Sequence, residues 1–192
     1  MPRQERAERT RIAILDAAAA EFDQHGYEGA RLERIVERTG ATKGAVYFHF
    51  RSKLDIATAL VAEKYANWPV IIGEVTASLR GLAAAEEVTR RVAEVFVRDV
   101  RVRAAMRLTQ TVFPPSPEES PYDRWIVVIG GLLQQELDDR GETGVDARAI
   151  ATVAVHGLFG AYMIANEMGT LADLPRDVER LWAALRPALH AS

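Results

Sequence analysis

The sequence predicts an all-α protein, with a small N-terminal three-helix domain and a larger helical C-terminal domain. Two observations carry this prediction. Apolar residues recur at helical spacing in nearly every segment, and glycines and prolines fall between those segments. No alternating strand pattern and no internal repeat interrupts the series. We therefore expect one domain over residues 1–53 and a second over residues 54–192.

The N-terminal domain is expected to hold three helices. The first spans about residues 4–24 and ends at Gly26, and the second covers residues 32–40. Thr42 then opens a short third helix that reaches Phe50. The turn between the second and third helices is as short as a helix-turn-helix requires, with a glycine where the preceding helix must stop.

The rest of the chain is predicted to be helical as well. Ser52-Lys53-Leu54-Asp55 has the pattern of a capping box and opens a long helix, which Pro69 is expected to kink or end near Trp68. The four prolines of segment 113–121 predict a loop. Further helices are expected over residues 83–101, 102–112, 122–139, 145–166 and 175–189.

Composition and charge narrow the class of protein. With 48% apolar and 27% charged residues, the chain has the composition of a soluble globular protein. We find no secretion signal and no run of about 18 apolar residues, so we expect a cytoplasmic protein without membrane contact. Residues 1–53 carry a net charge of +2, whereas the whole chain carries −3. This asymmetry is expected when only the N-terminal end binds DNA.

The sequence contains no motif that indicates an enzyme. The chain has no cysteine, and its four histidines are scattered. His49 has no second metal ligand three or four residues away, and the fingerprints of zinc proteases, serine hydrolases and nucleotide-binding loops are missing. We therefore expect no catalytic residue, no metal and no cofactor. A helical interaction module that does not bind DNA stays open as an alternative.

Two segments resemble a known family. AEFDQHGYEG and LERIVERTGATKGAVYFHFRSKLDIA resemble the N-terminal domain of TetR-type repressors. Within that family, RQERAERTR, FDQHGYE and GATKGAVYFHFRSK are similar to the γ-butyrolactone autoregulator receptors of actinomycetes. PYDRWIVVIGGLL resembles the segment in which those receptors carry a ligand-contacting tryptophan, here Trp125. One departure is clear: the family usually has Ser or Thr at the start of the second helix, where this chain has Gly29-Ala30-Arg31.

The resemblance implies how DNA is bound. A recognition helix reads base edges in the major groove while neighbouring residues bind phosphates. Gly44 would let the helix approach the bases closely, and Val46 is either buried or in contact with a thymine methyl group. Lys53 would bind a phosphate at the start of the next helix. The expected DNA-binding residues are Arg3, Arg6, Arg31, Thr42, Lys43, Gly44, Tyr47, His49 and Lys53.

The resemblance also implies a dimer that binds a small molecule. A homodimer formed through helices 145–166 and 175–189 would present two recognition helices to palindromic double-stranded operator DNA, and Gly157 and Gly160 would allow close helix approach. The implied effector is a γ-butyrolactone-like molecule. An antibiotic, a furan carboxylic acid or another hydrophobic compound stays open. The expected ligand-binding residues are Trp125, Met106, Gln110, Phe113, Val128, Ile129, Phe159 and Lys64.

Overall fold

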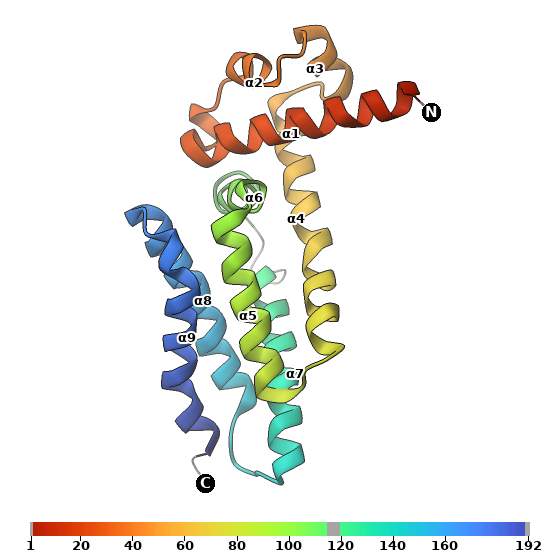
Figure 1. Ribbon diagram of the computed structural model, residues 1–192. Coiled ribbons are helices and arrows are strands. Elements are labelled where there is room, and N and C mark those ends of the chain that lie inside the picture. The colour runs from red at the N-terminus through yellow and green to blue at the C-terminus, as the bar shows by residue number, and fades with distance from the viewer. Residues whose placement is uncertain (1, 115–119, 191–192) are drawn as a thin grey trace. The chain divides into compact units, whose positions relative to one another are not determined.

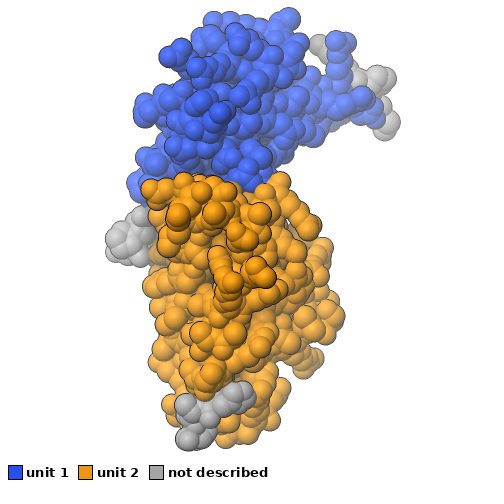
Figure 2. All heavy atoms as spheres, turned by 60° about the vertical axis from the view of Figure 1, so that its left-hand side comes forward, with its two compact units in different colours: residues 1–67, 99–114 blue, residues 68–98, 115–192 orange. Residues whose placement is uncertain are grey.

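The computed structural model describes residues 2–114 and 120–190, and their side chains except at positions 2–3, 64–67 and 190. The described residues form helices and contain no β-strand, as predicted. The chain divides into two compact units (Figure 2). Unit 1 comprises residues 1–67 and 99–114, and unit 2 comprises residues 68–98 and 115–192. The division therefore differs from the predicted boundary after residue 53.

Unit 1 contains the predicted helix-turn-helix (Figure 1), formed by α2 (Leu32–Thr39) and α3 (Lys43–His49), together with α1 (Pro2–Gly29), the first part of α4 (Lys53–Thr76) and α6 (Val100–Thr111). Gly26 does not end the first helix; it has φ 68° and ψ −179° and marks a kink, after which one more turn follows. Gly40 ends the second helix in the left-handed conformation, as predicted.

Helix α6 belongs to unit 1 because its arginines bind α1. Arg101 Nε donates to Asp16 at 2.7 Å, and Arg103 Nη2 donates to Asp23 at 3.0 Å. Ala104 and Leu108 of α6 also join the apolar core formed by α1, α2, α3 and α4. These partners lie about 80 residues away in the sequence, so helical periodicity alone could not predict the contact.

Unit 2 is a bundle of long helices. Pro69 does not end the helix, as one of the two predicted outcomes had it, because α4 continues through this residue to Thr76. The other helices of unit 2 are α5 (Gly81–Arg98), α7 (Pro121–Arg140), α8 (Ala147–Met168) and α9 (Leu174–Leu185), with short 3-10 segments at Leu171–Asp173 and Arg186–His190.

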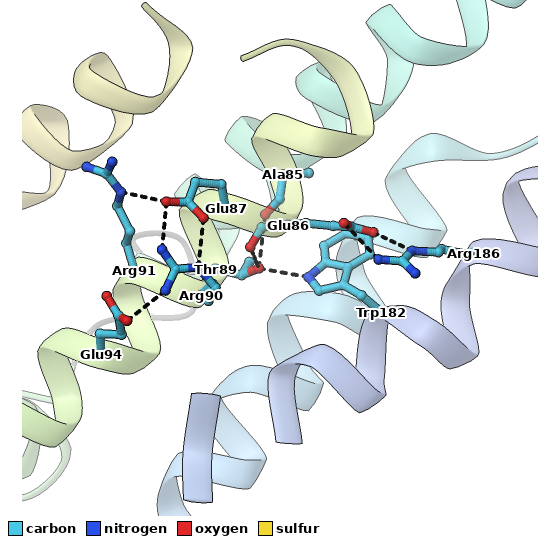
Figure 3. A network of polar contacts seen from close by, with 9 residues as sticks. All are labelled: Ala85, Glu86, Glu87, Thr89, Arg90, Arg91, Glu94, Trp182 and Arg186. Carbon is cyan, nitrogen blue, oxygen red and sulfur yellow. Dashed lines mark hydrogen bonds and ion pairs between the residues drawn. The ribbon is translucent and has the colours of Figure 1, made fainter. Parts of the chain in front are cut away.

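Polar contacts join α5 to α9 (Figure 3). Trp182 Nε1 donates to Thr89 Oγ1 at 2.7 Å, and that hydroxyl donates to the Ala85 carbonyl at 2.9 Å. On the surface of α5, Arg90 hydrogen-bonds Glu87 at 2.7 Å and lowers the pKa of this carboxyl from 4.5 to about 2. The Trp182–Thr89 hydrogen bond therefore joins α5 to α9, whereas the Arg90–Glu87 ion pair lies within α5.

Helix α8 is long and apolar enough to cross a membrane, judged by length and composition alone, whereas the sequence reading expected no such segment. It is the one such helix in the part of the chain that the structure describes. Ala154, Leu158 and Phe159 on this helix are buried inside unit 2. Because core helices of soluble proteins pass the same test, this is weak evidence for a membrane span.

Candidate nucleic-acid interface

The helix-turn-helix is fixed by local contacts at both sides of its turn. Gly40 adopts φ 63° at the end of α2, which glycine tolerates without strain. Thr42 Oγ1 accepts the backbone N–H of Ala45 at 3.2 Å and so caps α3. Val46 and Phe50 pack into the core of unit 1, so Val46 is buried and is not available to a thymine methyl group. The predicted turn and cap are confirmed.

The outer face of α3 is small, basic and aromatic. Lys43 and Gly44 are exposed at its first turn, and a Cβ atom added to Gly44 would meet no atom within 4 Å. Tyr47 is 42% exposed and His49 is partly buried. Phe48 is 82% exposed and packs edge-on to the His49 ring at 5.3 Å.

Sequence reasoning missed Phe48 as a candidate contact. The signal was present, because a helix turns about 100° per residue and Phe48 therefore lies about 200° around the axis from Val46 and from Phe50. Those two residues are buried, so the residue between them must face outward. An exposed phenyl ring on a recognition helix offers an apolar contact for the methyl group of thymine.

A groove of about 770 Å³ lies beside the turn, within unit 1. It is lined by two arginines, three threonines and small turn residues. Guanidinium, hydroxyl and backbone N–H groups are the donors that bind DNA phosphates. The lining residues are Arg6, Arg9, Thr10, Ala13, Thr39, Gly40, Ala41, Thr42 and Ala45.

The structure separates the cations of unit 1 into paired and available ones. Within the described residues, the side chains of Arg6, Arg31 and Arg51 have no hydrogen-bond or ion-pair partner. The Lys43 ammonium has no hydrogen-bond or ion-pair partner in the described part of the chain either, and lies 6.0 Å from the centre of the Tyr47 ring. Arg51 lies two residues after the end of α3 and was not among the predicted contacts. The side chain of Arg3, which was predicted to bind DNA, lies outside the described residues.

Lys53, which is predicted to bind a DNA phosphate, makes its contacts within unit 1. Its Nζ donates to the carbonyls of Tyr27 at 2.6 Å and Ala30 at 3.0 Å, and lies 4.4 Å from the centre of the Tyr27 ring. Two of the three ammonium donors therefore hold the end of α1. The capping box around it forms as predicted: Asp55 accepts from Ser52 Oγ at 2.9 Å, and Ser52 Oγ accepts the Asp55 N–H at 3.1 Å.

The predicted effector residues fall into two groups that different units hold. Trp125, Ile129 and Phe159 are buried in unit 2, and Val128 is half-buried. Met106, Gln110 and Phe113 belong to unit 1, where Met106 is buried and Gln110 is exposed. The side chain of Lys64 lies outside the described residues. The residues predicted to line one ligand-binding cavity are therefore divided between the two units, and four of them lie in unit 2.

Trp125 belongs to a series of contacting aromatic rings, three of which, Trp68, Phe96 and Tyr162, were not predicted from the sequence. The Trp68 ring meets the Trp125 ring at 5.5 Å and also meets Phe96 at 6.1 Å. Phe96 stacks on Tyr162 at 4.2 Å and meets Phe159 edge-on at 6.0 Å. These rings come from α4, α5, α7 and α8, so only the tertiary structure brings them together. In the described part of the chain, no cluster of three His, Asp or Glu side chains is placed to hold a metal ion.

The predicted dimer helices carry an exposed apolar face. Val153, Ile164 and Met168 on α8 are 52%, 62% and 72% exposed. Gly157 does not face outward, because a Cβ atom there would lie 2.7 Å from Leu181 Cδ2 of α9. It therefore serves α8–α9 packing within the chain. Gly160 has no atom within 4 Å of an added Cβ and remains open.

Comparisons with known proteins identify relatives of this chain by sequence and by structure. The sequence model of bacterial regulatory proteins of the tetR family matches residues 14–60. The A-factor receptor protein of Streptomyces griseus is 31% identical over 98% of this chain and 67% of its own length. A crystal structure of a gamma-butyrolactone receptor (ArpA-like protein) is 27% identical, with a TM-score of 0.70 over 93% of this chain and 98% of that one.

A further solved structure includes DNA. It is the TetR family protein CprB from Streptomyces coelicolor in complex with its biological operator sequence. This protein is 28% identical, with a TM-score of 0.79, and the match covers 94% of this chain and 88% of that one. The likeness therefore extends beyond the helix-turn-helix to both units.

Proposed function

Because the chain belongs to the TetR family of bacterial regulatory proteins, whose members are DNA-binding regulators and not enzymes, we propose that it is a ligand-responsive repressor. It binds palindromic operator DNA as a homodimer and is released by a γ-butyrolactone-type signalling molecule, and so controls secondary metabolism. The observation that supports DNA binding most strongly is the outer face of α3. It exposes Lys43, Gly44, Tyr47 and Phe48 beside a groove rich in donors.

In this proposal α3 enters the major groove. Gly44 allows close approach, Phe48 contacts a thymine methyl group, and Tyr47 and His49 direct their polar atoms to phosphates. Thr42, Arg6 and Arg9 line the groove beside the turn and bind the backbone. Further phosphate contacts come from Arg31, Lys43 and Arg51, whose side chains are exposed.

A dimer supplies the second half of the interface. One helix-turn-helix makes too few contacts for tight specific binding, so two copies read two half-sites one helical turn apart. The exposed face of α8, with Val153, Ile164 and Met168, offers an apolar surface to the same face of a second copy. Gly160 allows close approach at its centre.

The effector site is proposed for the aromatic interior of unit 2. Trp125, Phe159 and Ile129 give apolar walls suited to a small lactone with an alkyl tail. Release follows if the ligand binds better to a dimer whose recognition helices are mis-spaced for DNA. Helix α4 runs from Lys53 at the helix-turn-helix to Thr76 in unit 2, and is the continuous element that transmits the change.

Fluorescence anisotropy with palindromic fragments from upstream of the protein's own gene tests this proposal. We expect specific binding with a steep salt dependence, and release when a synthetic γ-butyrolactone with an alkyl tail is added. Binding that no salt concentration changes would exclude the DNA-binding function. Release by a furan carboxylic acid or an antibiotic, but by no butyrolactone, would replace the proposed effector with one of those compounds.

A further inference from the structure

The second helix of the helix-turn-helix begins without a cap from its own segment. Arg31 occupies the N-cap position of α2 with φ −114° and ψ 129°, and no side chain of that segment accepts the first N–H groups. These groups need acceptors, which Ser, Thr, Asp or Asn at the N-cap usually provide. Helix α2 must therefore obtain an acceptor from elsewhere.

A buried carboxylate of α1 accepts one of these N–H groups, that of the N-cap residue Arg31 itself, which a glutamate at the third helical position binds in a capping box. Glu21 Oε1 accepts the backbone N–H of Arg31 and Nη1 of Arg34, each at 3.4 Å. Its Oε2 lies 3.8 Å from Arg38 Nε and 3.9 Å from His25 Nε2. The Glu21 side chain is 0% exposed, and among the described residues none donates a hydrogen bond to Oε2. One carboxylate thus joins α1 to the start and to one face of α2.

Stability alone gives little reason for a charge at this position. Burying a carboxylate removes it from water, and an apolar side chain of similar size is often as stable in such a place. The side chains of Arg34 and Arg38 are 44% and 45% exposed, so water could solvate them without Glu21. What the carboxylate adds is orientation, because its partners on α2 reach it together only in one placement of that helix.

The placement of α2 determines the placement of α3. Only Gly40, Ala41 and Thr42 separate the two helices, and both turn ends are fixed by backbone and side-chain hydrogen bonds. We propose that Glu21 is a positioning residue for operator binding: it binds the N-cap N–H of α2 and the side chains of Arg34 and Arg38, and so holds α3 in the orientation that the operator requires. The inference rests on the proposed DNA-binding function.

Two substitutions at Glu21 and one matched control test the inference. Glu21→Leu fills the core without an acceptor or a charge, and Glu21→Gln keeps an acceptor without the charge. Glu28→Gln removes the same charge from an exposed position of α1 that has no partner among the described residues. Each variant is measured for operator affinity by fluorescence anisotropy at a temperature far below its unfolding transition.

The direction of the change in operator affinity distinguishes a positioning role of Glu21 from a long-range effect of its charge on DNA. Removing a negative charge near DNA strengthens binding or leaves it unchanged, which is the result expected for Glu28→Gln. Glu21→Leu should instead weaken operator binding by about tenfold, and Glu21→Gln by about threefold. Operator binding by Glu21→Leu that equals or exceeds that of the wild-type protein would overturn the inference.

A second cap at position 31 tests the route of the effect. In an Arg31→Ser background, the serine hydroxyl can accept the N–H of Glu33 or Arg34, and so holds the start of α2 by a second contact that does not involve Glu21. Glu21→Leu should then weaken binding by less than about threefold relative to Arg31→Ser alone. A tenfold loss in both backgrounds would show that Glu21 does not act through the start of α2, and the inference would fail.

Amide hydrogen exchange makes the test independent of DNA. Glu21→Leu should speed exchange across α2 relative to the middle of α1, whereas Glu28→Gln should not. If the wild-type protein binds no palindromic fragment, the proposed function fails while the exchange result still decides the role of Glu21 in holding α2. If Glu21→Leu does not fold, the same comparison is made with Glu21→Gln, and unchanged exchange in α2 contradicts the inference.

Discussion

Replacing Lys53 by methionine should reduce the stability of unit 1 and leave the number of DNA phosphate contacts unchanged. The ammonium group donates to Tyr27 O at 2.6 Å and Ala30 O at 3.0 Å and lies over the Tyr27 ring at 4.4 Å. A hydrogen bond from a charged donor contributes about 1.5–3 kcal/mol, and an exposed cation–π contact about 0.5–1 kcal/mol. Because Lys53 is only partly buried, we take the lower end and expect a loss of about 2–3 kcal/mol.

The assay must separate the two units. All three tryptophans, Trp68, Trp125 and Trp182, lie in unit 2, so tryptophan fluorescence follows that unit. Circular dichroism follows the helices of both units. Urea titrations of Lys53→Met should therefore show an earlier loss of helical signal, with a fluorescence transition close to that of the wild-type protein.

Lys43→Met is the matched control, since it makes the same substitution at an exposed lysine of α3. Its unfolding should match the wild-type protein, but the slope of log affinity against log salt should fall by about 0.9 per phosphate contact, or about 1.8 per dimer. Lys53→Met should leave that slope unchanged. The reverse outcome, with unchanged stability and a reduced slope for Lys53→Met, would refute the reasoning and restore the phosphate role.

Three further outcomes follow from particular contacts. Phe48→Ala should weaken operator binding by about tenfold without changing the salt slope, because it removes an apolar base contact; equal affinity in anisotropy titrations would contradict this. Thr89→Val should destabilise unit 2 by about 1–3 kcal/mol in urea titrations followed by tryptophan fluorescence, since it leaves Trp182 Nε1 without its acceptor. Glu87→Gln should lower the melting temperature at pH 7. Because the folded-state pKa of Glu87 is about 2 against an ordinary 4.5, the difference should shrink as the pH falls below 4.5, and a constant difference would refute the ion-pair explanation.

Local signals in the sequence were sufficient for the helix-turn-helix. Gly40 and Thr42 end and begin their helices by contacts with residues two to four positions away, so the turn could be read from residue type and spacing. The same is true of the Ser52–Asp55 capping box. Even Phe48 was within reach, because its exposure follows from the helical period once Val46 and Phe50 are buried.

Other features depend on partners that the sequence places far away. Asp23 of α1 pairs with Arg103 of α6, 80 residues later, and this contact draws α6 into unit 1. Pro69 removes one backbone donor from α4, yet the helix continues. Tertiary packing can offset the free-energy cost of one proline inside a helix. Lys53 lies at the start of a helix, a position that favours binding of a phosphate, but its ammonium group donates to the carbonyls of Tyr27 and Ala30.

The net charge of the N-terminal residues is a poor measure of the positive charge that is available to DNA. Residues 1–53 carry a net charge of only +2. Some of their cations have partners within unit 1, whereas others remain available to DNA. Arg11 binds Glu63, Arg34 and Arg38 face Glu21, and Lys53 holds α1. The cations without such a partner lie at the groove and around α3: Arg6, Arg31, Lys43 and Arg51, while Arg9 at the groove forms an exposed ion pair with Glu5 at 3.9 Å. Since electrostatic affinity depends on the charges that reach phosphates, this internal pairing confines binding to one face of unit 1.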